Sequence, residues 1–275
     1  MGRNHGAALP GSRGQVPSGS EADPRLIFAL PARAKLNLNL EVLGRSADGF
    51  HDLRTTFQAV ALHDLLEVEP AKETTFTTSG LRVSAETNSV LVAQQALESA
   101  AKRPLPARIH LDKRIPSGSG MGGASSDAAT TLRALKTMHT LDIDLAPIAR
   151  ELGSDVPFFL RGGRAHAEGR GERLTPLADE CAWFAIAWPG IELSTADVYR
   201  AWDELKGEGQ NHLRRAAEHV EPSLKEFAAS LGPGWQMTGS GSAFYTRINN
   251  EQEGRHAIGK LDCWTALTRA VGAWA

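Results

Sequence analysis

The chain has 275 residues, of which 41% are hydrophobic, and a formal net charge of −2. This length is enough for two domains with buried cores. The near-neutral charge gives no reason to expect nucleic acid or an anionic membrane as a partner. The two cysteines, Cys181 and Cys263, form no C-x-x-C pair. They therefore argue against a disulfide framework or a zinc site, favour a reducing cytoplasm, and are expected to be small core residues.

The first 24 residues are rich in Gly, Pro and Ser and lack the apolar region of a signal peptide. We expect them to be a disordered extension. The longest apolar run, CAWFAIAW from Cys181, is well short of the roughly 20 residues that a bilayer span needs, and it predicts a buried strand. The sequence thus indicates small-molecule substrates as partners, with no nucleic acid and no membrane, and leaves a monomer or a weak homodimer open.

The first predicted strand is KLNLNLEV, residues 35–42, in which apolar and polar side chains alternate. This period of two is typical of a strand with one buried face, so Lys35 and Asn37 are expected to share its open face. A loop containing GRSADGFHDL follows, and then a second strand region, AVALHDLLEVEP. Residues 88–102 are predicted to form a helix with Asn88 as its N-cap.

The next segment, ARIHLDK, predicts a strand that leads into a glycine loop, and SSDAATTLRALKTM predicts the helix beyond that loop, with Ser125 or Ser126 as its N-cap. LAPIAREL predicts another helix, which Gly153 ends. Asp155 is expected on a loop before Pro157.

The composition shifts near Pro176. After it we predict a strand, two or three helices, a strand pair around MTGSGSAFYT, a last helix and the strand WTALTRA. This alternation is typical of a separate α+β layer. The expected organisation is an extension over residues 1–24, a first domain over 25–177 and a second over 178–275.

The glycine loop, IPSGSGMGGASSDAA, matches the dinucleotide fingerprint G-x-G-x-x-G at Gly118, Gly120 and Gly123. Asp142 and Asp144 follow at about the spacing of the ribose-binding acid, but they lie between two predicted helices, whereas that acid ends a strand. A Walker A loop is excluded because G-K-[ST] is absent. What remains is a loop whose backbone N–H groups surround an anion at a helix N-terminus, which predicts phosphate binding in preference to a flexible linker.

This loop resembles the ATP loop of the GHMP kinases, a family that includes galactokinase, homoserine kinase and mevalonate kinase. ARAKLNLNLEVLGRSADGFHDL, SGSGMGGASSDAA, LGSDVPFFLRGGRAHAEGRGE and MTGSGSA, in this order, resemble the branch that phosphorylates 4-diphosphocytidyl-2-C-methyl-D-erythritol. The four motifs cover the chain from about Ala32 to its end. The resemblance implies two α+β domains with the active site in the cleft between them.

The resemblance also implies catalytic roles. Asp155 matches the aspartate that takes the proton from the substrate hydroxyl, and Lys35 matches the lysine that pairs with it. The chemistry is reasonable, because a carboxylate beside an ammonium stays ionised and the ammonium offsets charge on the moving phosphoryl group. Each residue has an ordinary structural alternative, a helix cap for Asp155 and a solvated strand end for Lys35.

Binding roles follow from the same resemblance. The cytidyl substrate is expected at Asn37, Phe50, His51, Tyr199, Thr238 and Gly239. In this set Phe50 stands where the family has tyrosine, and Tyr199 is equally explained as a core residue on an amphipathic helix. ATP is expected at Asn88, Lys113, Pro116, Ser117, Gly118, Ser119, Gly120, Met121, Gly122, Gly123, Ala124, Ser125 and Ser126. Mg²⁺ is expected to bridge the ATP phosphates, and no residue is assigned as its direct ligand.

Other candidate residues have structural explanations. His63 and Asp64 are adjacent on a strand and point to opposite faces, so they do not form an acid–base pair. Arg170 and Glu172 in EGRGE resemble a family motif, but a hairpin turn explains the glycines around them as well.

The predicted reaction is transfer of the ATP γ-phosphoryl group to the 2-hydroxyl of 4-diphosphocytidyl-2-C-methyl-D-erythritol, in the non-mevalonate isoprenoid pathway. Another GHMP kinase acting on a small alcohol, such as homoserine, a non-enzymatic nucleotide-binding sensor and a dinucleotide-dependent reductase are the alternatives.

Overall fold

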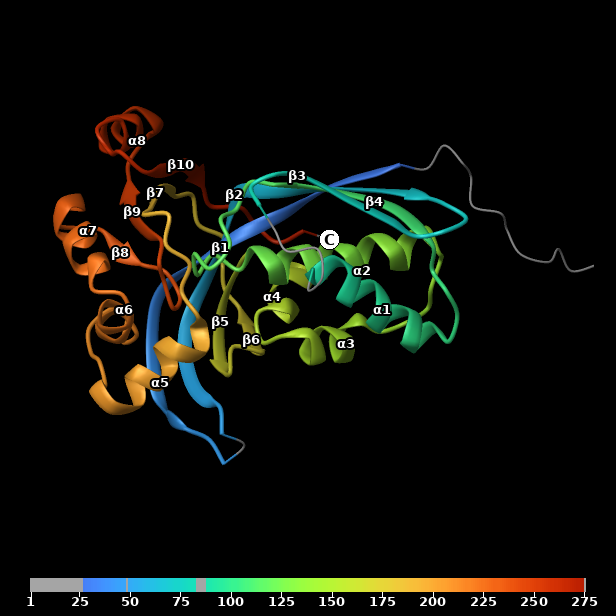
Figure 1. Ribbon diagram of the computed structural model, residues 1–275, viewed down its shortest axis with the longest axis horizontal. Helices are drawn as coiled ribbons and strands as arrows, with labels where there is room; N and C mark the ends of the chain where they lie inside the picture. The colour runs from blue at the N-terminus through green and yellow to red at the C-terminus, as the bar shows by residue number, and fades with distance from the viewer. Residues whose placement is uncertain (1–26, 48, 83–87, 275) are drawn as a thin grey trace, which may run out of the picture.

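The computed structural model describes residues 27–47, 49–82 and 88–274, so the expected extension over residues 1–24 lies outside the described residues. Within these ranges the long strands form two sheets, and helices accompany both (Figure 1). The larger sheet has the strand order β3-β4-β2-β5-β6, with β1 paired to β2, and the smaller has the order β10-β7-β9-β8. This is the α+β architecture that the sequence predicts.

The larger sheet is built from the first part of the chain. Its strands are β1 (Phe28–Arg45), β2 (His51–Pro70), β3 (Thr75–Gly80), β4 (Ala107–Lys113), β5 (Arg164–Gly169) and β6 (Arg173–Pro176). Its helices are α1 (Ser89–Ala101), α2 (Gly123–Met138), α3 (Leu145–Leu152) and α4 (Val156–Arg161). These four helices lie together on one side of the sheet (Figure 1), and buried side chains such as Leu66, Leu132 and Phe158 form the core between the two layers.

The smaller sheet contains β7 (Trp183–Trp188), β8 (Gln236–Met237), β9 (Phe244–Ile248) and β10 (Trp264–Arg269). Its helices are α5 (Thr195–Leu205), α6 (Arg214–Val220), α7 (Ser223–Leu231) and α8 (Glu251–Ile258), so the element order predicted after Pro176 is confirmed. The last strand of the larger sheet ends at Pro176 and the first of the smaller sheet begins at Trp183, and a domain boundary near Leu177 stays our proposal.

Residues beyond β10 do not stay with the smaller sheet. Ala270 bridges to Val60 of β2, and Ala273 bridges to Gly162 at the end of α4. Residues 270–273 therefore lie against the first part of the molecule, and Figure 1 shows the red segment after β10 running back in that direction.

The polar face of β1 is not open to bulk solvent as predicted, because Lys35 and Asn37 are each only 4% exposed. The Lys35 N–H donates to Met121 O of the glycine loop at 3.0 Å, and the Asn37 N–H donates to Thr238 Oγ1 at 3.0 Å. The alternating pattern correctly predicts the apolar face, but segments distant in sequence cover the polar face, and a local pattern carries no information about them.

Several boundaries differ from the sequence prediction, beginning with β1, which spans Phe28–Arg45 and not only residues 35–42. The strand β2 begins at His51, so the connection after β1 is shorter than GRSADGFHDL. The helix α2 begins at Gly123 and has Gly122 as its N-cap, which places Ser125 and Ser126 inside the helix. Asp155 is the N-cap of α4 and does not lie on a free loop.

The prediction for the cysteines was partly wrong. Both are free thiols, but Cys181 is exposed and Cys263 is only half-buried, so neither fills the core. In the described part of the chain, we find no helix with the length and apolar character that crossing a bilayer demands.

Candidate functional site

A cavity of about 1180 Å³ opens between the glycine loop, the β1–β2 hairpin, α4 and α5. Most of the residues singled out in the sequence line it, from both parts of the chain. They are Lys35, Asn37, Phe50, His51, Asn88, Lys113, Pro116, Ser117, Gly118, Ser119, Gly120, Gly122, Gly123, Ala124, Ser125, Asp155, Tyr199 and Gly239. The structure does not place Met121, Ser126 or Thr238 on the lining, and all three side chains are buried.

At the base of this cavity Lys35 from β1 meets Asp155 from α4. Lys35 Nζ lies 3.5 Å from Asp155 Oδ2, 2.6 Å from Asn37 Oδ1 and 2.7 Å from Gly120 O. The lysine side chain is 5% exposed and the aspartate side chain 27%. Burial lowers the pKa of Lys35 from its usual value, and the Asp155 carboxylate opposes that shift. The ammonium is thus buried and held, while the carboxylate remains open to the cavity.

The alternative explanation of Asp155 as a helix cap is not supported. It occupies the N-cap of α4, but its side chain makes no capping hydrogen bond. A carboxylate that neither caps its helix nor is buried is available to accept a proton from a bound hydroxyl.

The glycine loop is fixed in place and does not behave as a linker. Gly118, Gly120 and Gly122 have φ values of 60°, 76° and 72°, in the left-handed region that favours glycine. Ser119 Oγ donates to Pro116 O at 2.6 Å, and Ser119 O accepts from Ala243 N at 3.1 Å. The loop ends at the N-terminus of α2, where unpaired N–H groups favour an anion.

Two carboxylates hold the ammonium of Lys113 beneath this loop. Lys113 Nζ lies 2.5 Å from Asp64 Oδ2 and 2.7 Å from Asp127 Oδ2, and all three side chains are at most 3% exposed. Burial by itself would lower the pKa of Lys113, but Asp127 and Asp64 outweigh burial and raise it. Lys113 therefore links Asp64 and Asp127 inside the protein and also forms part of the cavity wall.

The same cluster raises the pKa of Asp127 to about 7. Burial is the largest cause; Lys113 opposes the shift, and the Asp64 carboxylate adds to it. Asp127 Oδ1 is buried without a hydrogen-bond partner in the structure. Asp64, in contrast, accepts the N–H groups of Arg114 and Ile115 at 2.6 and 2.7 Å, which fixes the entrance to the glycine loop.

The other end of the cavity is aromatic. His51 stacks on Tyr199 with ring centroids 4.8 Å apart, and His51 Nε2 lies 2.7 Å from Asp203 Oδ1 on the same helix as Tyr199. That contact with His51 is the main cause of the lowered pKa of Asp203. Phe50 is 55% exposed, and the Arg170 guanidinium lies 4.7 Å from its ring centroid. A flat, wide heterocycle would find exposed ring faces and hydrogen-bonding groups here.

Tyr199 also relates this aromatic end to the base of the cavity. Burial raises its pKa above the usual value, and the nearby Asp155 carboxylate raises it further. One face of its ring is already covered by His51, and a direct contact of Tyr199 with the substrate stays a prediction.

In the turn at 238–241, the position of the Thr238 hydroxyl differs from the expected one. The Thr238 hydroxyl was expected to face the substrate, but it is fully buried and accepts the Asn37 N–H at 3.0 Å. Asn211 fixes the same turn, because its Nδ2 donates to Met237 O at 2.8 Å and to Gly239 O at 2.9 Å. Gly239 and Ser240 are the residues of this turn that line the cavity.

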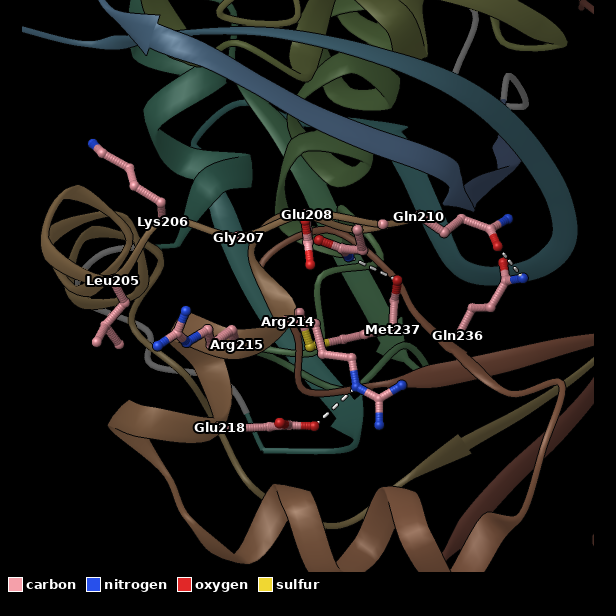
Figure 2. A pocket seen from close by; sticks show the side chains of 12 residues that line it. Leu205, Lys206, Gly207, Glu208, Gln210, Arg214, Arg215, Glu218, Gln236 and Met237 are labelled. Atoms are coloured by element: carbon pink, nitrogen blue, oxygen red, sulfur yellow. Dashed lines mark hydrogen bonds and ion pairs between the residues drawn. The ribbon is translucent and has the colours of Figure 1, made fainter.

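A second cavity, of about 620 Å³, lies between the α5–α6 connection and β8 (Figure 2). Arg214 on its lining is already paired, since Arg214 Nε lies 2.8 Å from Glu218 Oε1. None of the residues predicted from the sequence lines this cavity. The candidate site is therefore the cavity that contains Lys35 and Asp155.

Sequence reasoning missed Asp64, Asp127 and Asp203. Asp64 was set aside because its neighbour His63 points to the opposite face, and His63 Nδ1 forms a hydrogen bond with Ala61 O at 2.7 Å. The motif SSDAA contains Asp127, but nothing local indicates that it faces Lys113. The EGRGE stretch is the turn of the β5–β6 hairpin, with Arg170 N donating to Glu172 Oε2 at 2.7 Å, as the structural explanation predicted. Asp144 is the N-cap of α3 and not a ribose-binding acid.

The fold and site define a class of protein. Residues 88–163 match the family described as GHMP kinases N terminal domain. Mevalonate kinase from Methanococcus jannaschii, at 14% identity, superposes with a TM-score of 0.59 over 93% of this chain and 100% of that chain, which shows the shared fold.

More similar proteins define the family within this class. 4-Diphosphocytidyl-2-C-methyl-D-erythritol kinase from Chromohalobacter salexigens is 35% identical over 82% of this chain and 84% of its own length, and the kinase of that name from Methylococcus capsulatus is 38% identical over 86% and 89%. A crystal structure of 4-(cytidine 5'-diphospho)-2C-methyl-D-erythritol kinase, 36% identical, superposes with a TM-score of 0.77 over 89% of this chain and 100% of that chain. The chain belongs to the 4-diphosphocytidyl-2-C-methyl-D-erythritol kinase family.

Proposed function

We propose that the protein transfers the γ-phosphoryl group of ATP to the 2-hydroxyl of 4-diphosphocytidyl-2-C-methyl-D-erythritol, with Lys35 and Asp155 as the catalytic pair. The observation that carries this assignment is the 3.5 Å approach of Lys35 Nζ to Asp155 Oδ2 at the base of the cavity. Family membership supports the substrate, and the aromatic end of the cavity supports recognition of a pyrimidine base.

In the proposed reaction, Asp155 accepts the proton of the substrate hydroxyl as its oxygen attacks the γ-phosphorus. A new O–P bond forms, the bond between the γ-phosphorus and the bridging oxygen of ADP breaks, and the proton stays on the carboxylate. Lys35 offsets the negative charge that spreads over the transferring group. Because Gly120 O and Asn37 Oδ1 fix the ammonium, little reorganisation is needed during transfer.

ATP is proposed to bind with its phosphates over the glycine loop and the first turn of α2, where backbone N–H groups favour an anion. Asn88 and Lys113 are proposed to lie beside the nucleotide; Asn88 Oδ1 already accepts Val90 N as a helix cap, which leaves its amide N–H groups for a ligand. The described residues include no cluster of three potential metal ligands. Mg²⁺ is proposed to enter the site as part of the MgATP substrate.

The cytosine ring is proposed to stack on Phe50 and to be read by His51, with Tyr199 behind His51 and Asn37 and Gly239 nearer the phosphates. The two unpaired cysteines fit a reducing compartment, so we keep the cytoplasm as the expected location.

The test is to incubate the purified protein with MgATP and the cytidyl substrate, and to follow ADP release and the new phosphomonoester by ³¹P NMR. Homoserine and mevalonate serve as competing acceptors. Turnover restricted to the cytidyl substrate is expected. Nucleotide binding without any ADP release would favour a sensor, and preference for a small alcohol would favour another GHMP activity.

A further inference from the structure

The residues that follow β10 run back across the molecule to the first sheet (Figure 1). Val271 N donates to Ala59 O of β2 at 3.0 Å, and Gln58 Nε2 donates to Val271 O at 3.3 Å. Three residues later Trp274 N donates to Arg161 O, the last residue of α4, at 2.9 Å. The segment 271–274 therefore joins one strand and one helix that otherwise belong to different layers.

The end of α4 is shaped to receive this segment. Gly162 and Gly163 have φ values of 70° and 75°. A Cβ atom at Gly162 would overlap the Trp274 ring, and one at Gly163 would lie 2.8 Å from Ala273 N. The Trp274 side chain also packs against the core beneath the larger sheet. Glycine at both positions thus allows a close approach that a side chain would prevent.

The helix that receives the segment is the one that presents Asp155. It spans only Val156–Arg161, and a helix of this length depends on tertiary contacts for its stability. Asp155 makes no capping bond of its own, so its position follows from how α4 is seated. Phe158 and Phe159 seat the helix in the core, and the segment 271–274 holds its C-terminal end.

The strand that receives the segment is the one that faces Lys35. Ala59 is the ladder partner of Lys35 in the β1–β2 pair. Its carbonyl accepts Val271 N, and its N–H donates to Gly163 O at 2.8 Å. The segment 271–274 is thus connected to Lys35 through β2 and to Asp155 through α4.

We propose that the segment 271–274 is a positioning element for the kinase reaction, which sets the separation of Lys35 and Asp155 by tying β2 to the end of α4. The inference rests on the proposed function for its activity readout. It assigns no chemical step to the segment, which does not line the cavity. A misplacement of about 1 Å caused by a change distant from the reacting atoms can cost about 10²-fold in rate, so such a tie has a measurable effect.

The test uses two substitutions that break the tie in different ways. Val271→Pro removes the N–H that donates to Ala59 O, and Trp274→Ala removes the ring that packs on Gly162 while keeping the backbone donor. Both are expected to lower kcat roughly 10- to 100-fold with the KM of each substrate within about twofold. Val271→Ala, which keeps the N–H, is expected to retain turnover.

Two further measurements separate positioning from general destabilisation. Leu224→Ala empties a buried site in α7, far from the pair, and should lower stability in urea without lowering kcat. In an Asp155→Asn background, Val271→Pro should cost little additional turnover, because residues that act as a unit are non-additive. Unchanged kcat in folded Val271→Pro and Trp274→Ala proteins, or a full additional loss in the Asp155→Asn background, would overturn the inference.

Hydrogen exchange tests the positioning role without any substrate. Hydrogen exchange of the α4 amides should accelerate in Val271→Pro and Trp274→Ala relative to wild type, while exchange in α1 stays the same. Unchanged α4 exchange in both variants contradicts the inference even if the cytidyl substrate proves to be wrong. An inactive wild-type protein, in contrast, contradicts only the proposed function.

Discussion

Lys35 Nζ and Asp155 Oδ2 lie 3.5 Å apart, although one residue belongs to the first strand of the chain and the other begins the fourth helix. Burial and two oxygen acceptors fix the lysine, whereas the aspartate keeps an open path to the cavity. The two groups therefore differ in freedom, as a fixed cation and an accessible base should.

This pairing predicts the effect of removing each partner. Asp155→Asn keeps the size of the side chain but cannot accept a proton, and the loss of a general base typically lowers turnover by roughly 10²–10⁴-fold. Lys35→Met should also lower turnover, and the double variant should be little slower than the slower single variant. Turnover and both substrate affinities of the four proteins provide the measurement. Full activity of folded Asp155→Asn protein excludes the proposed base, and fully additive losses exclude the pairing.

How far the sequence predicts this site depends on the range of the interaction. The strand ARIHLDK, the N-cap Asn88 and the glycine that ends α3 are all local features, and each was predicted correctly. The predicted N-cap of α2 was wrong because Ser125 and Ser126 are good caps in isolation, whereas the actual N-cap is the left-handed Gly122.

Contacts between distant segments could not be predicted in the same way. Nothing in KLNLNLEV indicates that Thr238 covers Asn37, or that Met121 covers Lys35. Asp64 and Asp127 are separated in sequence by two strands and a helix, yet they share the ammonium of Lys113. The buried residues that support the site through contacts between distant segments can thus be identified only in the folded structure.

The phosphate-binding role of the glycine loop can be tested at Ala124, which is exposed in the first turn of α2 and lines the cavity. Ala124→Asp favours the helix electrostatically but places a negative charge where phosphate is proposed to bind. The KM for ATP should rise by about fivefold or more, given a repulsion of at least about 1 kcal/mol at close range. Ala124→Asn is the uncharged control, and equal KM values for both variants would contradict the assignment.

Gly122 is less suitable for this purpose. A Cβ atom there would lie 2.8 Å from Phe159 Cζ and 3.3 Å from Lys35 Cε, and φ is 72°. Gly122→Val would therefore disturb the core and the catalytic lysine together with the loop, and a loss of ATP binding would have several causes.

Substrate identity can be tested at Phe50. The side chain is 55% exposed, so Phe50→Ala should change the free energy of unfolding by no more than about 0.5 kcal/mol. Loss of base stacking should weaken binding of the cytidyl substrate by about 1–3 kcal/mol and leave ATP binding unchanged. Isothermal titration calorimetry with the cytidyl substrate and with ATP measures the two affinities. Leu43→Ala, at a 50% exposed position that does not line the cavity, is the control. Equal weakening of both ligands would move the pyrimidine site elsewhere.

The last prediction concerns the pH dependence of stability. In the folded protein the pKa of Asp127 is about 7, whereas the pKa of an aspartate in the unfolded chain is about 3.9. Between these values the folded state binds a proton that the unfolded state lacks, so the contribution of Asp127 to stability is full below about pH 4 and decreases as the pH rises through 7. Between pH 5 and pH 8 this contribution should fall by between about 2 and about 3 kcal/mol.

Asp127→Asn should remove that decrease, because the amide does not titrate and leaves Lys113 paired one-to-one with Asp64. Urea unfolding at pH 5 and pH 8 should therefore show that the variant gains stability relative to wild type as the pH rises. Asp64→Asn is the matched control. It weakens the bonds to Lys113, Arg114 and Ile115, so it should be destabilising at both pH values. If wild type and Asp127→Asn lose stability equally between pH 5 and pH 8, Asp127 does not hold a proton in the folded protein at pH 5. Another group must then offset the net charge of Lys113, Asp64 and Asp127.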